Sequence, residues 1–125
     1  MTEQEIRTIL NRQREYFATG ATLSRKFRAE QLGKLKASLQ RHEEELNAAL
    51  QQDLGKSRME SYMCEIGLTL SELTWMQKHL RGLMQEKRVP TPLSQFAAIS
   101  FRSPSPYGTV LIMSPWNYPV LLTLD

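Results

Sequence analysis

The sequence predicts a mostly α-helical chain of 125 residues, in which amphipathic helices are followed by two β-strands. Two observations lead to this fold class. Apolar residues recur at every third or fourth position from residue 2 to about residue 88, which is the period of helices that bury one face. From residue 89 onward, prolines interrupt this period and apolar runs of the kind found in strands replace it.

The first helical segment begins with a capping box, in which Thr2 and Glu5 each satisfy a free backbone N–H group near the helix start, and it ends at Gly20. Ser24 begins a second segment, whose apolar stripe continues to Leu50. This stripe fits one long helix, or two helices with a bend at residues 41–45 ("RHEEE").

The next break is at Gly55, which supplies a left-handed position after a helix, and residues 57–60 ("SRME") form a second capping box. From Met59 to Leu83, apolar residues trace one face of a long helix. Together with the preceding segment, this pattern predicts helical hairpins.

Two strands are expected after the helices. Pro90 and Pro92 prevent a continuing helix, and residues 95–103 ("QFAAISFRS") alternate as a strand does. Residues 109–114 ("TVLIMS") are a continuous aliphatic run, typical of a strand buried on both faces of a parallel sheet. Such a strand needs partners, and residues 115–125 are too few to supply them. The sequence therefore predicts a truncated protein.

Composition restricts the possible functions. Lys and Arg number 16 against 13 Asp and Glu, and the basic residues are scattered among acidic ones, which argues against nucleic-acid binding. A single cysteine, Cys64, agrees with a reducing compartment. Neither a signal peptide nor an apolar run of the ~20 residues needed for a transmembrane helix is present in the sequence. We therefore expect a cytoplasmic protein.

Most candidate sites have a simpler structural explanation. Residues 53–57 ("DLGKS") lack the first glycine of a phosphate-binding loop, and a helix end followed by a helix start explains them. Cys64 lies beside the apolar stripe of a helix and is expected to be a structural thiol. His42 and His79 have no catalytic partner visible in the sequence, and the spacing of potential ligands predicts no metal site.

Residues 115–119 ("PWNYP") have two explanations. In the first they are a turn, in which the prolines stop the preceding strand and the aromatic residues fill a core. In the second they form a functional site, because the carboxamide of Asn117 follows a parallel strand, where open α/β sheets bind ligands. The pattern alone leaves both open.

The stretch "PYGTVLIMSPWNYPVLLTLD" (106–125) resembles the beginning of the cofactor-binding domain of aldehyde dehydrogenases, and residues 27–67 resemble the N-terminal helices of the same superfamily. The likeness extends from about residue 5 to residue 125 and is strongest to the subgroup that acts on fatty and aromatic aldehydes. It implies an α/β parent fold with a Rossmann-like sheet. Residues 1–88 would be the helical part of the cofactor-binding domain, 89–104 a linker and strand toward the bridging, oligomerisation region, and 105–125 the first strand and turn of the Rossmann-like part.

The resemblance also implies a chemistry. A cysteine thiolate attacks the aldehyde, hydride passes to NAD or NADP, and water cleaves the resulting thioester. Asn117 matches the asparagine that donates its side-chain amide to the oxyanion. Ser114, Pro115 and Trp116 match residues beside the nicotinamide. The parent enzyme is expected to be a homo-oligomer such as a homodimer, with an aldehyde as its substrate.

The chain departs from the family pattern in one respect. The family's cysteine nucleophile and glutamate base lie downstream of the asparagine motif, and Cys64 does not match the nucleophile. We therefore expect an N-terminal fragment of an NAD(P)-dependent aldehyde dehydrogenase that is inactive alone. The alternative is a non-catalytic helical module that acts through oligomerisation or interaction.

Overall fold

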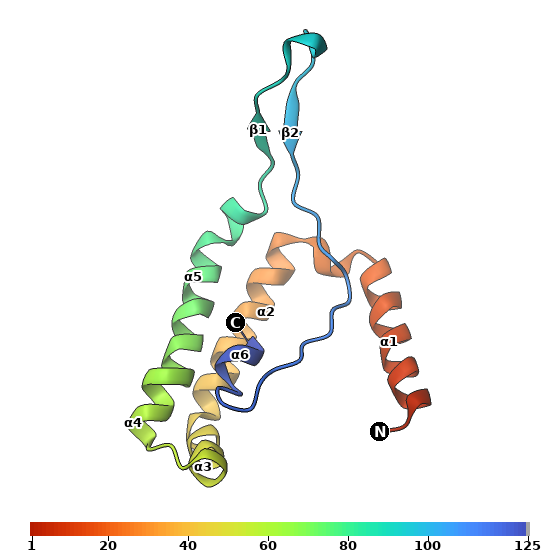
Figure 1. Ribbon diagram of the computed structural model, residues 1–125. Coiled ribbons are helices and arrows are strands. Elements are labelled where there is room, and N and C mark those ends of the chain that lie inside the picture. Colours follow the sequence, from red (N-terminus) through yellow and green to blue (C-terminus); the bar gives the residue numbers. More distant parts are fainter. Residues whose placement is uncertain (125) are drawn as a thin grey trace.

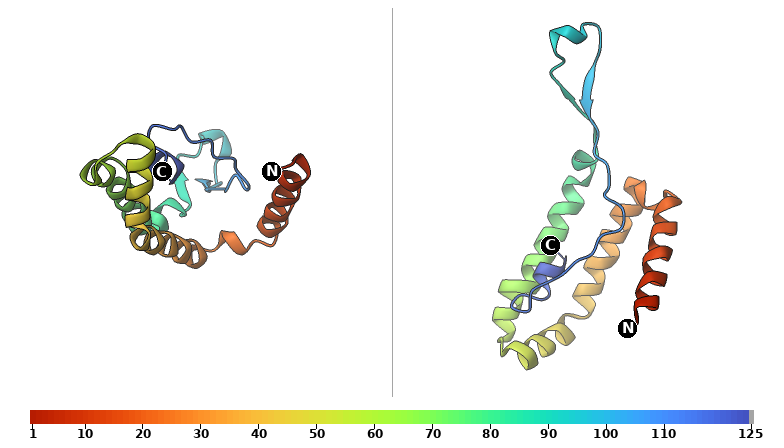
Figure 2. Two further views of the ribbon diagram at one scale, coloured as in Figure 1. Left: turned by 90° about the horizontal axis from the view of Figure 1, so that it is seen from below. Right: turned by 45° about the vertical axis from the view of Figure 1, so that its right-hand side comes forward.

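The fold is known from a computed structural model that describes residues 1–124. Figure 1 shows α2 and α5 side by side and a β-hairpin that projects away from the helices, and α6 lies against α5. In the left view of Figure 2, α1 lies away from α5, on the far side of α2. The helices are α1 (Glu3–Ala18), α2 (Arg25–Arg41), α3 (Glu43–Leu54), α4 (Arg58–Ser61), α5 (Gly67–Leu83) and α6 (Leu121–Leu124), and the strands are β1 (Lys87–Val89) and β2 (Ser100–Arg102).

The helix boundaries expected from local sequence signals are confirmed. The capping box of Thr2 and Glu5 is present with both of its hydrogen bonds, and Gly20 has the left-handed φ of 74° that ends the first helical segment. Ser24 caps α2 by accepting a hydrogen bond from the Phe27 N–H. Of the two possibilities for residues 24–50, the structure has two helices, which meet at His42.

The long helix expected from Met59 to Leu83 is continuous, but its hydrogen-bond pattern is not uniform. Gly55 ends α3 with a left-handed φ of 68°, and Ser57 caps α4. Residues Tyr62–Ile66 then form a π-helical turn that joins α4 to α5. The periodicity of apolar residues does not predict this turn, because one extra residue in one turn barely changes the pattern.

The core lies where α2, α3, the π turn and α5 pack together. Its buried apolar side chains are those expected from the helical stripes, and each contributes about 1.5–3 kcal/mol through removal from water. They are Leu39, Leu50, Ile66, Leu73 and Leu80. The same region buries two side chains that carry charge, Lys56 and Glu65.

The strands differ in position from those expected. β1 and β2 form one antiparallel pair, with Arg88 opposite Phe101, and β1 was not predicted. Only residues 100–102 of the expected strand 95–103 are a strand, because Leu93–Gln95 form a 3₁₀ turn and Ala97 has a φ of 73°. The expected strand 109–114 is not formed. Within residues 1–124, β1 and β2 are the whole of the sheet structure, so residues 109–114 have no ladder partner.

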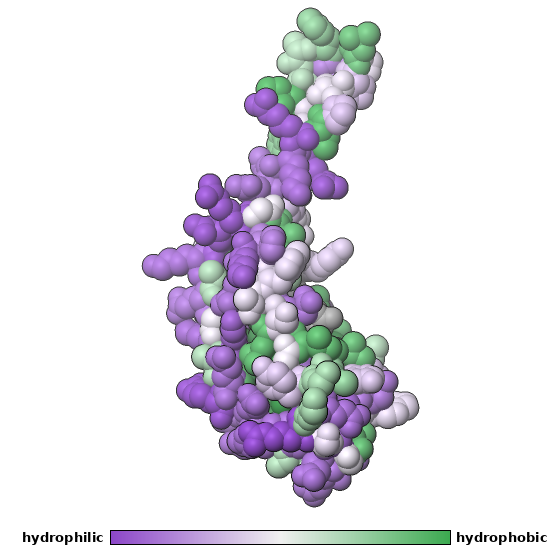
Figure 3. Space-filling model, turned by 90° about the vertical axis from the view of Figure 1, so that its left-hand side faces the viewer, coloured by the Kyte–Doolittle hydropathy of each residue, from purple (hydrophilic) through white to green (hydrophobic). Residues whose placement is uncertain are grey.

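The tip of the hairpin is apolar and exposed. In the space-filling view of Figure 3, hydrophobic residues gather at this tip, above a helical surface that is mostly hydrophilic. Leu93 and Phe96 are each 87% exposed, and Ile99 is 66% exposed. Side chains of this kind in one place are typical of a surface that contacts another chain.

Candidate functional site

Asn117 lies in a bend between the extended segment 109–115 and the start of α6. Residues 115–118 are exposed, and the indole of Trp116 is 87% exposed. The first explanation of "PWNYP", in which both aromatic residues fill a core, is therefore wrong for Trp116. Tyr118 is 38% exposed, and its ring lies against the side chain of Lys56.

The helices place a carboxylate directly beneath this bend. Glu65 lies in the π turn and is completely buried. The turn brings Gly67 close to Tyr62, and the Gly67 N–H donates to the Tyr62 carbonyl. A Cβ atom on residue 67 would lie 2.7 Å from that carbonyl oxygen, so the backbone would have to shift to accept any side chain there. Glycine at position 67 thus permits the turn that buries Glu65.

Lys56 neutralises this carboxylate. It lies in the short loop between α3 and α4, only 8% exposed, and its Nζ is 2.5 Å from Glu65 Oε1. Both charged ends are therefore removed from water. A buried pair of this kind is tolerated only where the two groups face each other closely and their remaining hydrogen-bonding capacity is also satisfied.

The donor and acceptor groups of the pair that are not used in the ion pair bind the bend that carries Asn117. Lys56 Nζ donates to the Asn117 backbone carbonyl at 2.9 Å and lies 4.1 Å from the centre of the Tyr118 ring, a cation–π distance. Glu65 Oε2 accepts a hydrogen bond from the Val120 N–H at 2.8 Å and a longer one from the Leu121 N–H at 3.5 Å. One ion pair therefore holds the backbone on both sides of Pro119.

This arrangement fixes the backbone of Asn117 while its side chain stays exposed. A carboxamide can donate a hydrogen bond and stays neutral at any working pH. The site can therefore offer a neutral donor, on an anchored backbone, to an oxygen that gains negative charge. Of the other residues expected here, Ser114, Pro115 and Trp116 are exposed beside Asn117, and the Ser114 hydroxyl donates to the Pro115 carbonyl at 3.3 Å.

Lys56 and Glu65 were missed as site residues. Lys56 falls within "DLGKS", which a helix end and a helix start explain, and Glu65 falls within a predicted helix. The only available signal was an acidic residue on the side of the helix next to its apolar stripe.

The other candidates do not join this site. Cys64 is a half-buried free thiol on the π turn, and His79 stacks on Trp75 with ring centres 4.3 Å apart. His42 lies 3.2 Å from Glu45 within its own helix turn. Among residues 1–124, no group of three or more acidic, His or Cys side chains could hold a metal ion, and none of the helices there is both long and apolar enough to cross a membrane.

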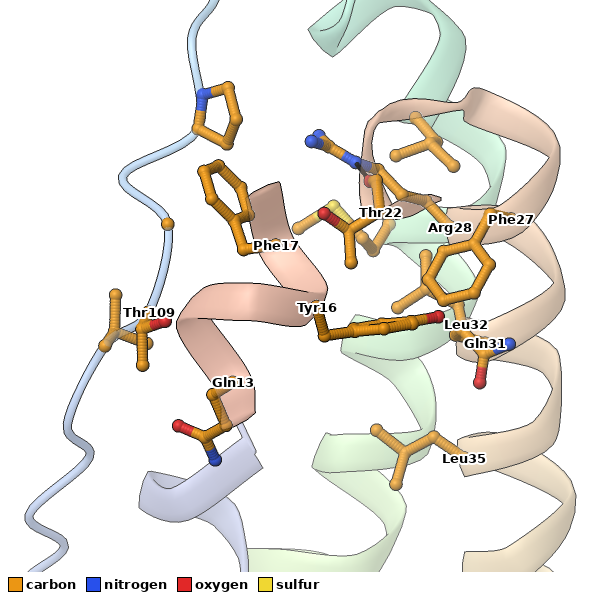
Figure 4. A pocket seen from close by; sticks show the side chains of 15 residues that line it. Gln13, Tyr16, Phe17, Thr22, Phe27, Arg28, Gln31, Leu32, Leu35 and Thr109 are labelled. Carbon is orange, nitrogen blue, oxygen red and sulfur yellow. Dashed lines mark hydrogen bonds between the residues drawn. The ribbon is translucent and has the colours of Figure 1, made fainter. Parts of the chain in front are cut away.

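A separate apolar groove of about 720 Å³ lies between α1, α2, α5 and the segment 106–110. In the close view of Figure 4, Tyr16 points toward Phe27 and Leu32, and Phe17 points toward the extended segment. Its charged lining residue, Arg28, donates to the Thr22 carbonyl at 2.8 Å. Because the lining includes neither Asn117 nor its neighbours, the groove is not part of the site described above.

Residues 1–125 match the model of the aldehyde dehydrogenase family, and the chain belongs to this family of oxidoreductases. The family predicted from the sequence is therefore confirmed, as is the mostly helical fragment of an α/β fold.

The similar proteins are longer than this chain. It is 41% identical over 110 residues to 4,4'-diaponeurosporen-aldehyde dehydrogenase of Staphylococcus aureus, covering 88% of this chain and 24% of that protein. It is 43% identical over 115 residues to human aldehyde dehydrogenase family 3 member B1, covering 92% and 25%. A solved structure titled as the substrate-bound state of Staphylococcus aureus AldH matches with a TM-score of 0.92 and 39% identity, over 95% of this chain and 26% of that one. The chain thus spans about a quarter of the length of these relatives.

Proposed function

We propose that this chain forms part of an NAD(P)-dependent aldehyde dehydrogenase, in which Asn117 stabilises the oxyanion that forms when a cysteine thiolate attacks the aldehyde. The main support is the position of Asn117. Its backbone carbonyl is bound by a buried lysine, and its carboxamide is exposed. Donors that are fixed in advance stabilise developing charge without reorganising during the reaction, and this is the largest contribution in many enzymes.

The cysteine nucleophile of this proposal lies outside the chain. Cys64 is half-buried on the π turn, and the family resemblance does not match it to the nucleophile. The chain's own role is to position groups. Asn117 donates a hydrogen bond to the oxygen of the attacked carbonyl, and the amide remains neutral as that oxygen gains charge. We expect the chain alone to be inactive.

Residues 114–116 fit a nicotinamide cofactor in their chemistry. They offer a hydroxyl, a rigid proline and an exposed indole in one stretch next to Asn117. An apolar indole surface that other described residues leave uncovered suits an aromatic ring, and a hydroxyl suits a polar edge. When bound, the cofactor supplies the acceptor for the hydride. Ser114, Pro115 and Trp116 would contact it and would keep water from that side of the site.

The substrate would be an aldehyde with an apolar body. This proposal rests on the likeness of "PWNYP" to the subgroup for fatty and aromatic aldehydes and on the name of the Staphylococcus aureus relative, which specifies an aldehyde of diaponeurosporen. We also propose that the parent enzyme is a homo-oligomer. Leu93, Phe96 and Ile99, which are exposed at the hairpin tip, support a contact between subunits.

A chimeric enzyme tests the role of Asn117. In it, this chain replaces the matching quarter of the Staphylococcus aureus enzyme, to which it is 41% identical. Asn117→Ala removes one oxyanion donor and is expected to lower kcat by about 10²–10³, with little change in KM for the cofactor. Asn11→Ala, at an exposed position of α1, makes the same chemical change elsewhere and should leave kcat unaltered. A near-normal kcat with a raised cofactor KM in Asn117→Ala would show that Asn117 is a binding or turn residue instead.

A further inference from the structure

We propose that Lys56 and Glu65 are positioning residues, which set the backbone of Asn117 so that its carboxamide meets the oxyanion. This inference rests on the proposed function of Asn117. The two residues do not touch the substrate in this proposal. They act through the bend at residues 117–121, to which they are bound by three backbone hydrogen bonds.

The first argument is that stability alone gives little reason for this pair. Removing two charges from water has a large cost, and replacing a buried ion pair with apolar groups of similar size often leaves a protein equally stable or more stable. Lys56 and Glu65 are 8% and 0% exposed, and their Nζ and Oε1 atoms are 2.5 Å apart. Because burying this pair costs free energy, its presence is more easily explained by the segment that it positions, residues 117–121.

The second argument is that the hydrogen bonds of the pair converge on a single segment. Lys56 Nζ reaches the Asn117 carbonyl and the Tyr118 ring, and Glu65 Oε2 accepts from two successive N–H groups, those of Val120 and Leu121. Contacts on both sides of Pro119 fix both the position and the direction of the chain at Asn117. A single contact would allow it to rotate.

The third argument is that, within residues 1–124, the bend has little other support. Residues 110–118 are all exposed, and none of residues 103–120 lies in a helix or strand. Oxyanion stabilisation depends on donor placement, and an error of about 1 Å can lower a rate by about 10². Within these residues the anchor comes from the core, where the π turn buries Glu65 beneath the bend. Single π turns within α-helices are frequent at functional sites.

The test uses the chimeric enzyme described above and a double variant, Lys56→Met with Glu65→Gln. Removing both charges leaves no unpaired buried charge, so we expect this variant to fold with an unfolding midpoint near that of the parent. We expect kcat to fall about 10- to 100-fold, with KM for the aldehyde and the cofactor little changed. Exchange of the Val120 and Leu121 amide hydrogens should become faster, which reports the loosened bend independently of activity.

The matched control is Lys34→Met with Glu30→Gln. These substitutions remove another Lys–Glu pair, 2.8 Å apart, that lies on the surface of α2 with side chains 64% and 54% exposed. Kcat and amide exchange at Val120 should stay at parental values, because exposed pairs within a helix contribute little. A second variant, Lys56→Arg, leaves Glu65 with a cationic partner but moves the donor that reaches the Asn117 carbonyl. Its kcat should also fall.

Combination with Asn117→Ala separates this inference from the proposed function. If the pair acts through Asn117, then Lys56→Met with Glu65→Gln lowers kcat no further once Asn117 is alanine. Parental kcat in either the double variant or Lys56→Arg overturns the inference, and so does a full additional loss in the Asn117→Ala background. Parental kcat in Asn117→Ala itself refutes the oxyanion role and, with it, the catalytic part of this inference. Amide exchange then still decides whether the pair anchors the bend.

Discussion

Gly67 is the position at which a single methyl group tests the geometry of the site most directly. It follows the π turn that buries Glu65, and its N–H donates to the Tyr62 carbonyl. In Gly67→Ala, the new Cβ would lie 2.7 Å from that carbonyl oxygen and 3.0 Å from the Tyr62 ring. The first contact is with backbone, which cannot move aside as the end of a flexible side chain can.

The expected magnitude follows from two opposing contributions. Carbon and oxygen atoms that are not bonded approach to about 3.3 Å, so the backbone must shift by about half an ångström. Overpacking of this kind costs about 1–3 kcal/mol. Alanine is favoured over glycine in a helix by up to about 1 kcal/mol, which offsets part of that cost. We therefore expect Gly67→Ala to lower the free energy of unfolding by up to about 2 kcal/mol.

Gly82→Ala is the matched control, because it makes the same change in the same helix. A Cβ at residue 82 meets nothing within 4 Å, so only the helix preference remains and the variant should gain about 0.5–1 kcal/mol. Urea unfolding of the 125-residue chain, followed by helical circular dichroism at low micromolar concentration, should separate the two midpoints by about 1 M. A midpoint for Gly67→Ala equal to or above that of Gly82→Ala would show that the π turn is not constrained as described.

Two further predictions concern the chain on its own. With NAD and a medium-chain or aromatic aldehyde, it should produce no NADH above the blank, and a turnover signal that disappears in Cys64→Ser would contradict this. In light scattering at tens of micromolar, the chain should be a dimer or larger, because Leu111 and Met113, in the segment without a ladder partner, are 82% and 85% exposed. A chain ending at about residue 88 should be smaller and more soluble, whereas a stable monomer of the intact chain would refute the association.

The helices could be predicted because their signals are local. A capping box, a glycine in the left-handed conformation and an apolar residue at every third or fourth position act within a few residues of each other, so Thr2, Gly20 and Gly55 have the conformations expected of them. The strands depend on neighbours distant in sequence. Residues 109–114 have the composition of a buried strand. A β-strand is defined by hydrogen bonds to a neighbouring strand, however, and composition alone does not supply that neighbour.

The candidate site divides in the same way between local and distant information. Asn117 could be found because its neighbours in the sequence, two prolines and two aromatic residues, make a motif. Lys56 and Glu65 are 61 and 52 residues away from Asn117, and only the fold brings them to the bend. Within its own segment, each has an ordinary local explanation as a loop lysine or a helical glutamate. The pair points to a role only once the structure shows that both charges are buried and that their hydrogen bonds end on residues 117–121. A pair of the same residues on the surface would be solvated by water and would not need hydrogen bonds from the backbone.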